Sequence, residues 1–247
     1  MASLVHDDVI DDSDTRRGKP TVKSHWDNQI AMLTGDFIFA KALQQFTDIE
    51  YPRAHQILSK TMVELTIGGE IEQIRDKFNY EQNFRSYLRR IRRKTALLIS
   101  SSCQLGAVVA ETSSETEKAL YNYGYYMGMS YQIIDDILDF TATEKELGKP
   151  SGSDLLQGNI TLPVLYAMEN PQIKASIINL FANKEQMNQV ELKRVVEAIA
   201  KSGAIEKARR VSNTYLKKAY HSLKKLPNNQ SKSALENIAN FIGNRKI

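Results

Sequence analysis

The chain of 247 residues has a single cysteine, Cys103. It therefore has no internal disulfide framework, which suits a reducing compartment and predicts a cytoplasmic protein. Long apolar runs are missing as well, because the longest candidate, residues 96–110, is interrupted by three serines and a glutamine. A transmembrane helix needs roughly 18 consecutive apolar residues, so no membrane-spanning segment is expected.

Glycine and proline are also scarce. Twelve glycines and six prolines make up about 7% of the chain, against about 12% in average proteins. Few turn formers favour long helices over many short strands, and apolar residues recur at helical spacing along most of the chain. A net charge of +4 is too small to indicate nucleic-acid binding. The sequence predicts one all-α domain over 1–247, with helices over 1–12, 27–47, 50–78, 81–110, 114–141, 161–169, 171–182, 188–201, 204–226 and 231–244.

Two segments break the helical pattern, residues 13–24 and 141–159. Both contain glycine and proline, the residues of turns, and both directly follow a cluster of aspartates. The clusters share the spacing D-D-x-x-D, formed by Asp7, Asp8 and Asp11 in the first and by Asp135, Asp136 and Asp139 in the second.

Residues three and four apart lie on the same face of a helix, so each cluster forms an edge of mutually repelling carboxylates. Apolar residues before and inside both clusters predict that the two helices are largely buried. Buried carboxylates need cations. A set of oxygen ligands without cysteine or histidine suits Mg²⁺, which completes its shell with water and substrate phosphates. The six aspartates are therefore predicted to form a magnesium site.

Other interpretations of the clusters are weaker. One cluster alone would fit a solvated acidic helix face equally well, but two copies with similar flanks favour a metal site. A di-iron helical bundle would need Glu-x-x-His motifs, and none of the four histidines lies in one. An EF-hand is excluded because the loop after Asp11 lacks alternating acidic ligands and the terminal glutamate.

Basic residues follow both clusters. Arg16 and Arg17 come shortly after the first, and Lys149 lies in the loop after the second. Guanidinium groups bind phosphate through two parallel hydrogen bonds. A Mg²⁺ site surrounded by such cations is a receptor for a diphosphate.

The run RSYLRRIRRKT holds further basic residues, most of which are expected on an exposed helix face. Lys94 differs, because its neighbours Ile91 and Leu98 indicate that it lies on the inward stripe with Thr95 beside it. A lysine that points into a helical core needs a partner from elsewhere in the fold, such as a bound anion.

The sequence has no Ser-His-Asp set, no activated cysteine and no phosphate-binding glycine loop. The predicted site can still hold a diphosphate and stabilise its departure. Ionisation of an allylic diphosphate requires little more, provided that the carbocation is shielded from water.

At this point the sequence resembles the trans-prenyl diphosphate synthases, all-α enzymes of the isoprenoid synthase type that extend an allylic diphosphate with isopentenyl diphosphate. The likeness covers nearly the whole chain and rests on both aspartate motifs in order. It includes the segments DDVIDDSDTRRGKPTV, AMLTGDFIFAKAL, RKTALL, YQIIDDILDF and GKPSGSDLLQGNITLPVLYA.

The resemblance assigns roles to the matching positions. Asp7, Asp11 and Asp135 would ligate Mg²⁺, with Asp8, Asp136 and Asp139 in support. Arg16 would bind the allylic diphosphate and Arg17 the isopentenyl diphosphate. Lys94 and Lys149, with either Lys145 or Asp154, would belong to the diphosphate cage. Thr95 and Gln132 would lie beside the cationic tail.

Within this family the likeness is greatest to two-component bacterial enzymes that make the heptaprenyl precursor of menaquinone. It implies farnesyl diphosphate as the allylic substrate, and a small partner subunit or a second copy of the chain. Family members carry two or three helices before the first motif, whereas only six residues precede Asp7 here. Met1 is therefore expected to be an internal methionine of a longer protein, and part of the isopentenyl diphosphate site is expected to be missing.

Product length is expected to depend on Ala2 and Ser3, about one helical turn before Asp7. Short-chain members often carry a bulky aromatic residue there, which stops the growing chain. Two small side chains predict an open path and a long product. Two other functions stay open: a terpene cyclase, which usually lacks the intact second motif, and a non-catalytic subunit.

Overall fold

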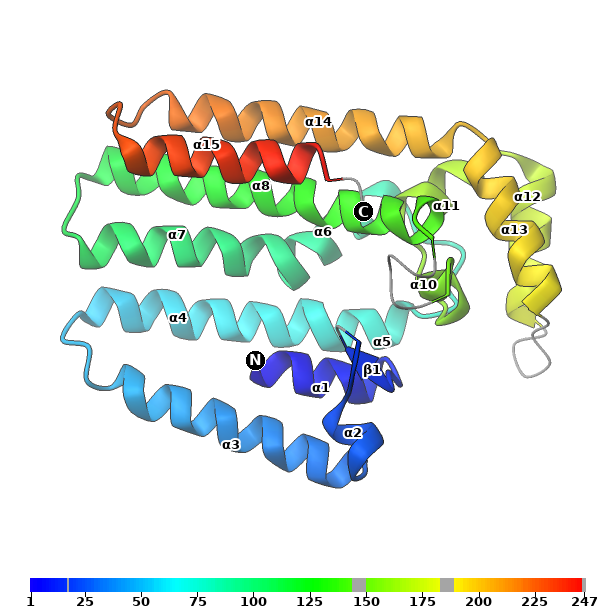
Figure 1. Ribbon diagram of the computed structural model, residues 1–247, viewed down its shortest axis with the longest axis horizontal. Coiled ribbons are helices and arrows are strands. Elements are labelled where there is room, and N and C mark those ends of the chain that lie inside the picture. The colour runs from blue at the N-terminus through cyan, green and yellow to red at the C-terminus, as the bar shows by residue number, and fades with distance from the viewer. Residues whose placement is uncertain (17, 144–149, 183–188, 246–247) are drawn as a thin grey trace. The chain divides into compact units, whose positions relative to one another are not determined.

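A computed structural model describes residues 1–16, 18–143, 150–182 and 189–245 of the chain. They form helices almost throughout (Figure 1), which confirms the all-α prediction. In this described part, strands occur in one antiparallel pair, β1 (Thr15–Arg16) and β2 (Lys19–Pro20). The pair lies in the segment expected to be a turn, where Gly18 takes a φ of 73° that favours glycine.

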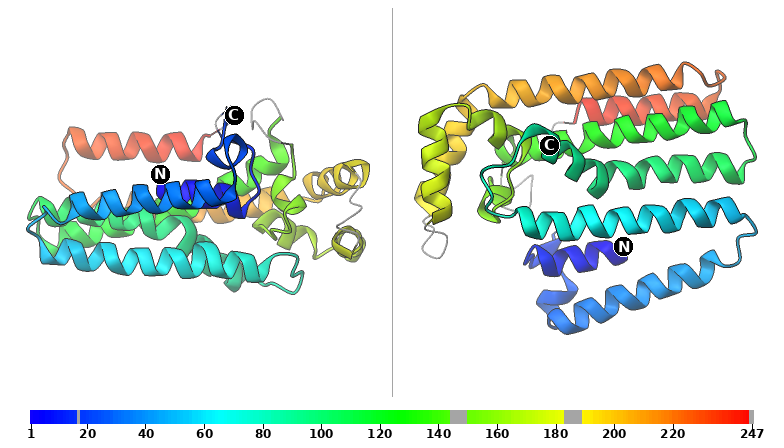
Figure 2. Two further views of the ribbon diagram at one scale, coloured as in Figure 1. Left: turned by 90° about the horizontal axis from the view of Figure 1, so that it is seen from below. Right: turned by 180° about the vertical axis from the view of Figure 1, so that it is seen from behind.

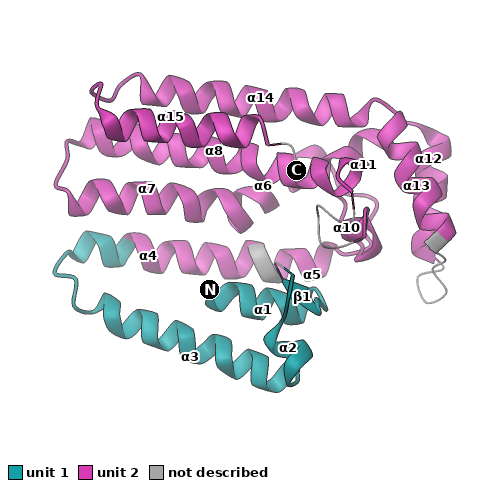
Figure 3. Ribbon diagram, viewed as in Figure 1, with its two compact units in different colours: residues 1–56 teal, residues 57–247 magenta. Residues whose placement is uncertain are grey.

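The chain divides into two compact units, residues 1–56 and 57–247 (Figure 3). The first aspartate motif lies in unit 1 and the second in unit 2. No helix within the described ranges is both long enough and apolar enough to cross a membrane.

Unit 1 consists mainly of α1 (Ala2–Ile10) packed against α3 (Asn28–Phe46), joined by the strand pair and the short α2 (Val22–His25). The two long helices approach closely at a glycine. A Cβ on Gly35 would lie 2.2 Å from the ring of His6. The imidazole therefore occupies the space that a larger residue in α3 would fill.

In unit 2, the helices expected over 50–78 and 81–110 are both interrupted by a π-helical segment. Such segments are rare and are frequent at functional sites. The elements in order are α4 (Pro52–Leu65), which begins in unit 1, η1 (Thr66–Ile71), α5 (Glu72–Asp76), α6 (Phe84–Ile91), η2 (Arg92–Ala96) and α7 (Leu97–Val109).

The centre of unit 2 is α8 (Ser114–Thr141), a helix of 28 residues whose C-terminal part carries the second aspartate motif. Figures 1 and 2 show it alongside α7, α14 (Ala204–Leu223) and α15 (Gln230–Gly243). The remaining helices are α10 (Ser153–Leu156), α11 (Leu162–Ala167), α12 (Pro171–Ala182) and α13 (Gln189–Lys201), of which α10 lies in a segment expected to be a loop.

The larger apolar core of unit 2 surrounds the half of α8 that carries the motif. Its fully buried members include Met129, Ile133, Ile134, Ile137 and Leu155. Packed cores hold side chains in fixed positions. The aspartates that project from this half of α8 therefore stand on a rigid support.

Gly128 lets α8 approach the start of α7 closely. A Cβ on Gly128 would lie 2.7 Å from the Cα atom of Ala96, which is backbone and cannot turn aside. Gly124, one turn earlier in α8, is equally close to the α7 backbone, because a Cβ there would lie 2.8 Å from the Cα atom of Ser100. Both glycines thus serve helix packing.

We expect Gly128→Ala to lower the free energy of unfolding by about 1–3 kcal/mol, the usual effect of overpacking. Thermal and denaturant unfolding would measure it. Gly106→Ala is the matched control, because no atom lies within 4 Å of a Cβ at this helical position. It should be neutral or stabilise by up to about 1 kcal/mol through helix propensity. Equal stability of the two variants would contradict the close approach.

Candidate active site

The first motif separates its aspartates by exposure. Asp8 is buried, with 5% of its surface exposed, whereas Asp7 and Asp11 are partly exposed at the end of α1. The Nε and Nη2 atoms of Arg16 both lie 2.7 Å from Oδ1 of Asp8. Arg16 therefore compensates the buried charge of Asp8, and Asp7 and Asp11 are the more exposed carboxylates of this motif.

His6, beside Asp7 in sequence, does not join the carboxylates. Its Nε2 atom lies 3.2 Å from the backbone oxygen of Met32 and 3.3 Å from Oδ1 of Asp36, both on α3. The imidazole thus links α1 to α3.

The two residues expected to control product length lie at the start of α1. Ser3 is exposed and Ala2 is partly buried. With about 100° of rotation per residue in a regular helix, Ser3 lies on the same edge as Asp7. Ala2 lies nearer the edge of His6, which faces α3.

The second motif shows the same division. Asp135 is exposed, whereas Asp136 and Asp139 are 3% and 1% exposed. Oδ1 of Asp139 lies 3.1 Å from the hydroxyl of Ser153, and Oδ2 accepts from the backbone N–H of Asp154 at 3.2 Å. Asp139 thus fastens the start of α10 to α8.

Asp136 belongs to a chain of hydrogen bonds that links α6, η2 and α8. The hydroxyl of Tyr87 donates to Oδ2 of Asp136 at 2.6 Å, and Nε2 of Gln132 donates to Oδ1 at 2.9 Å. Oε1 of Gln132 in turn accepts from the hydroxyl of Thr95 at 2.6 Å. The structure therefore brings Thr95 and Gln132 together with the second motif.

Burial raises the pKa of Asp136 from 3.8 to about 7, and the charges of Asp154 and Asp135 add to this rise. The hydrogen bonds from Tyr87 and Gln132 act in the opposite direction. Burial also raises the pKa of the Tyr87 phenol, so this group remains a donor. A nearby cation would favour the charged form of Asp136.

Lys94 is partly buried and donates through Nζ to Oε1 of Gln73 at 2.6 Å. Its inward position agrees with the prediction, and its partner in the structure is an amide. Leu98, expected on the same stripe, is 43% exposed. The prediction for Leu98 was wrong because the π turn over 92–96 changes the helical register that the spacing argument assumed.

Arg245 approaches the second motif from the C-terminal part of the chain. Its Nη1 atom lies 3.3 Å from Oδ1 of Asp135, and its guanidinium lies 5.2 Å from the centre of the Tyr131 ring. The exposed Asp135 thus has a cationic group, the Arg245 guanidinium, beside it.

Three predicted residues, Arg17, Lys145 and Lys149, lie outside the described residues. The prediction that the run over 85–94 is mainly exposed was wrong for two arginines. Arg90 is 8% exposed and donates to Gln82 and to the backbone oxygen of Ile160, and the Arg93 side chain is 20% exposed.

Sequence analysis missed Tyr87, Gln73 and Arg245. Their partners in the candidate site, Asp136, Lys94 and Asp135, are 49, 21 and 110 residues away in the sequence, respectively. No local pattern distinguishes these residues. They are found only from the three-dimensional contacts that they make with the motif residues and Lys94.

Comparison with known proteins decides the family. The family described as Polyprenyl synthetase matches residues 1–199. The chain belongs to the polyprenyl synthetase family. This confirms the resemblance and prenyl transfer as its activity.

Two curated relatives are both named heptaprenyl diphosphate synthase component 2. The one from Bacillus subtilis is 58% identical over all of this chain and 70% of its own length. The one from Geobacillus stearothermophilus is 54% identical over 99% of this chain and 75% of its own length.

Solved structures agree with the family assignment. A heptaprenyl diphosphate synthase from Staphylococcus aureus has a TM-score of 0.94 and 46% identity, covering 99% of this chain and 76% of that one. A polyprenyl synthase from Caulobacter crescentus, complexed with calcium and isoprenyl diphosphate, has a TM-score of 0.94 and 32% identity. The match covers all of this chain and 75% of that one.

The donor set of this polyprenyl synthetase suits a hard divalent cation that is shared with a substrate. Within the described residues, no three His, Cys, Asp or Glu side chains are grouped to hold a metal by themselves. Mg²⁺ commonly uses one or two carboxylates together with water and substrate phosphates. Asp7 and Asp11 in unit 1, and separately Asp135 in unit 2, are carboxylates of this kind.

The pKa of Asp136 predicts a pH-dependent stability. Between pH 3.8 and about 7 the folded chain holds a proton that the unfolded chain releases. In EDTA, the contribution of Asp136 to the free energy of unfolding should therefore fall as pH rises through this window, by roughly 1.4 kcal/mol per pKa unit. Asp136→Asn should remove this contribution. The melting temperature of the variant minus that of the wild type should therefore increase as the pH is raised from 5 to 8. A difference in melting temperature that stays constant with pH would contradict the prediction.

Proposed function

We propose that the chain is the catalytic component of a heptaprenyl diphosphate synthase. It would condense isopentenyl diphosphate with farnesyl diphosphate and repeat the reaction to a heptaprenyl product that serves as a menaquinone precursor. The identity of 58% to a component 2 carries the proposal. The partly exposed Asp7 and Asp11, the exposed Asp135, and the hydrogen-bonded Thr95 and Gln132 support it.

In this proposal, Asp7, Asp11 and Asp135 hold Mg²⁺, which when bound neutralises the diphosphate and makes it a better leaving group. Asp8, Asp136 and Asp139 would support these ligands through the contacts described above. Arg16, Arg17, Lys94 and Lys149 would bind diphosphate oxygens.

The reaction needs no catalytic histidine. The bond between C1 of the allylic group and the diphosphate oxygen breaks, and its electron pair leaves with the diphosphate. The double bond of isopentenyl diphosphate then attacks C1, and a proton leaves to a diphosphate oxygen. The Thr95 proton is used in its bond to Gln132, so the lone pairs of the Thr95 oxygen are available to stabilise the carbocation.

The relatives named component 2 suggest a partner subunit, and the single cysteine suits a reducing compartment. We propose that the chain works with a small second component in the cytoplasm, with a second copy of the chain as the alternative partner. Purified chain should be assayed with Mg²⁺, both diphosphates, and with or without the first component from a related Bacillus. A terpene cyclase is disfavoured because the second motif is intact.

The aspartates provide the first test. Asp7→Ala and Asp135→Ala should each lower kcat by about 100-fold or more, since metal-held charge stabilisation contributes several kcal/mol. Steady-state assays of the reconstituted enzyme would measure it, and calorimetry with farnesyl diphosphate and Mg²⁺ would measure binding separately. The exposed Asp48→Ala is the control. Near-normal turnover in either motif variant would refute the assignment.

Product length provides the second test. If the growing tail runs along α1 from Asp7, a side chain one turn earlier, about 5.4 Å away, blocks it. Ser3→Phe should then shorten the product by one or more isoprene units, with turnover preserved. Ala2→Phe should shorten it less, because Ala2 lies nearer the α3-facing edge. Chromatography of the products by chain length would measure both, and an unchanged product in both variants would contradict the tunnel.

A further inference from the structure

The two π-helical segments of unit 2, η1 and η2, pack against each other. Gly68 of η1 faces Arg93 of η2 so closely that a Cβ on Gly68 would lie 2.1 Å from the Cβ of Arg93. Any larger residue at position 68 would therefore displace the backbone of one segment. The contact places the Arg93 side chain across η1.

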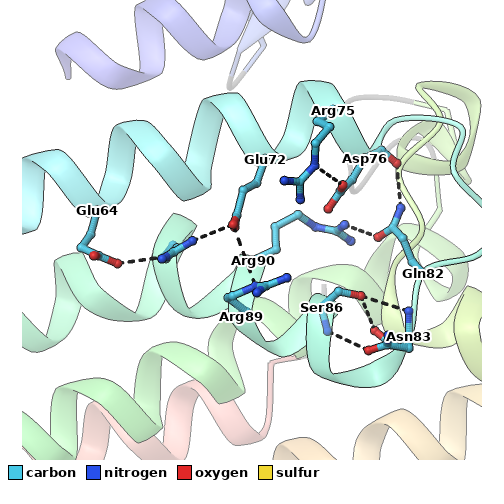
Figure 4. Close-up of polar contacts among 10 residues, drawn as sticks. Glu64, Glu72, Arg75, Asp76, Gln82, Asn83, Ser86, Arg89 and Arg90 are labelled. Carbon is cyan, nitrogen blue, oxygen red and sulfur yellow. Dashed lines mark hydrogen bonds and ion pairs between the residues drawn. The ribbon is translucent and has the colours of Figure 1, made fainter.

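The Arg93 guanidinium bridges two glutamates that flank η1 in sequence. Its Nε atom lies 3.0 Å from Oε2 of Glu64, and its Nη1 atom lies 2.6 Å from Oε1 of Glu72. The two glutamates are labelled in Figure 4. The three side chains are 20%, 27% and 11% exposed. A planar guanidinium with separate donors can satisfy both carboxylates at once, whereas a lysine ammonium is a single point charge.

The residues that follow this bridge belong to the candidate site. Gln73 follows Glu72 and accepts from Lys94, which follows Arg93, at 2.6 Å. Thr95 comes next and donates to Gln132. The bridge therefore fixes the backbone from which Lys94 and Thr95 project.

We propose that Arg93, Glu64 and Glu72 form a positioning clamp, made possible by Gly68, that keeps η2 in its π turn and thereby orients Lys94 and Thr95. The proposal rests on the proposed roles of Lys94 and Thr95 in prenyl transfer. A π turn holds one residue more than an α turn. Its loss would rotate the following side chains by about 100° relative to those before it, which would turn Lys94 or Thr95 away from the substrate.

The first test replaces the bridging group while its charge is kept. Arg93→Lys should lower kcat about 10- to 100-fold in the full, reconstituted enzyme, because small displacements of catalytic groups have effects of that size. Gly68→Ala should act in the same direction. Arg85→Lys, on the exposed side of α6, and Gly106→Ala in α7 are matched controls that should leave kcat unchanged. Full activity of Arg93→Lys would overturn the proposal.

A double-mutant cycle separates positioning from simple stability. If Arg93 acts through Lys94 and Thr95, adding Arg93→Lys to the pair Lys94→Ala and Thr95→Val should lower kcat little beyond that pair alone. Two effects that multiply would show that Arg93 acts through neither residue and would contradict the clamp. Normal turnover of Lys94→Ala would instead refute the proposed role of Lys94, and absence of turnover in the wild-type reconstituted enzyme would refute the proposed function, so these failures are distinguishable.

A readout independent of activity completes the design. A crystal structure of Arg93→Lys should show η2 as a regular α-helix and the bond between Lys94 and Gln73 broken. An unchanged π turn would overturn the proposal. Should Arg93→Lys fail to fold, Glu64→Gln removes one charge at the more exposed end of the bridge, and the same two readouts apply to it.

Discussion

The rest of the structure depends on one constraint: carboxylates that are taken into a helical core must be compensated there. Asp8 is compensated by Arg16, Asp136 by the hydroxyl of Tyr87 and the amide of Gln132, and Asp139 by donors at the start of α10. Each motif thus anchors itself with its buried aspartates. The more exposed aspartates are the ones that we propose as Mg²⁺ ligands.

The same anchoring organises the surroundings of the second motif. The bonds of Asp136 reach α6 through Tyr87 and η2 through Gln132 and Thr95. Because η2 is also held by the bridge from Arg93 to the glutamates on either side of η1, the cationic, hydroxyl and carboxylate groups of this half of the site share one rigid network. Electrostatic stabilisation of a departing diphosphate benefits from such fixed groups, since they need no rearrangement during the reaction.

Much of the molecule was predictable from the sequence. The scarcity of turn formers and the helical spacing of apolar residues were enough for the all-α fold, because helix formation is mainly local. The repeated spacing of the aspartates, followed by cationic loops, indicated diphosphate chemistry before any relative was compared. The expected inward position of Lys94 also agreed with the structure.

What the sequence could not determine depends on contacts between distant segments. Spacing arguments assume an uninterrupted α-helix, so they failed at Leu98, just beyond the π turn of η2. The expectation that most of the basic run is exposed did not single out Arg93, whose side chain is 20% exposed. The buried partners Tyr87 and Gln73 come from other helices, and only packing decides which polar side chains meet. The residue types that carry the chemistry are therefore determined by the sequence itself. Which aspartates are buried, and which groups orient Lys94 and Thr95, is decided by tertiary structure, because burial and hydrogen bonding are properties of packed helices.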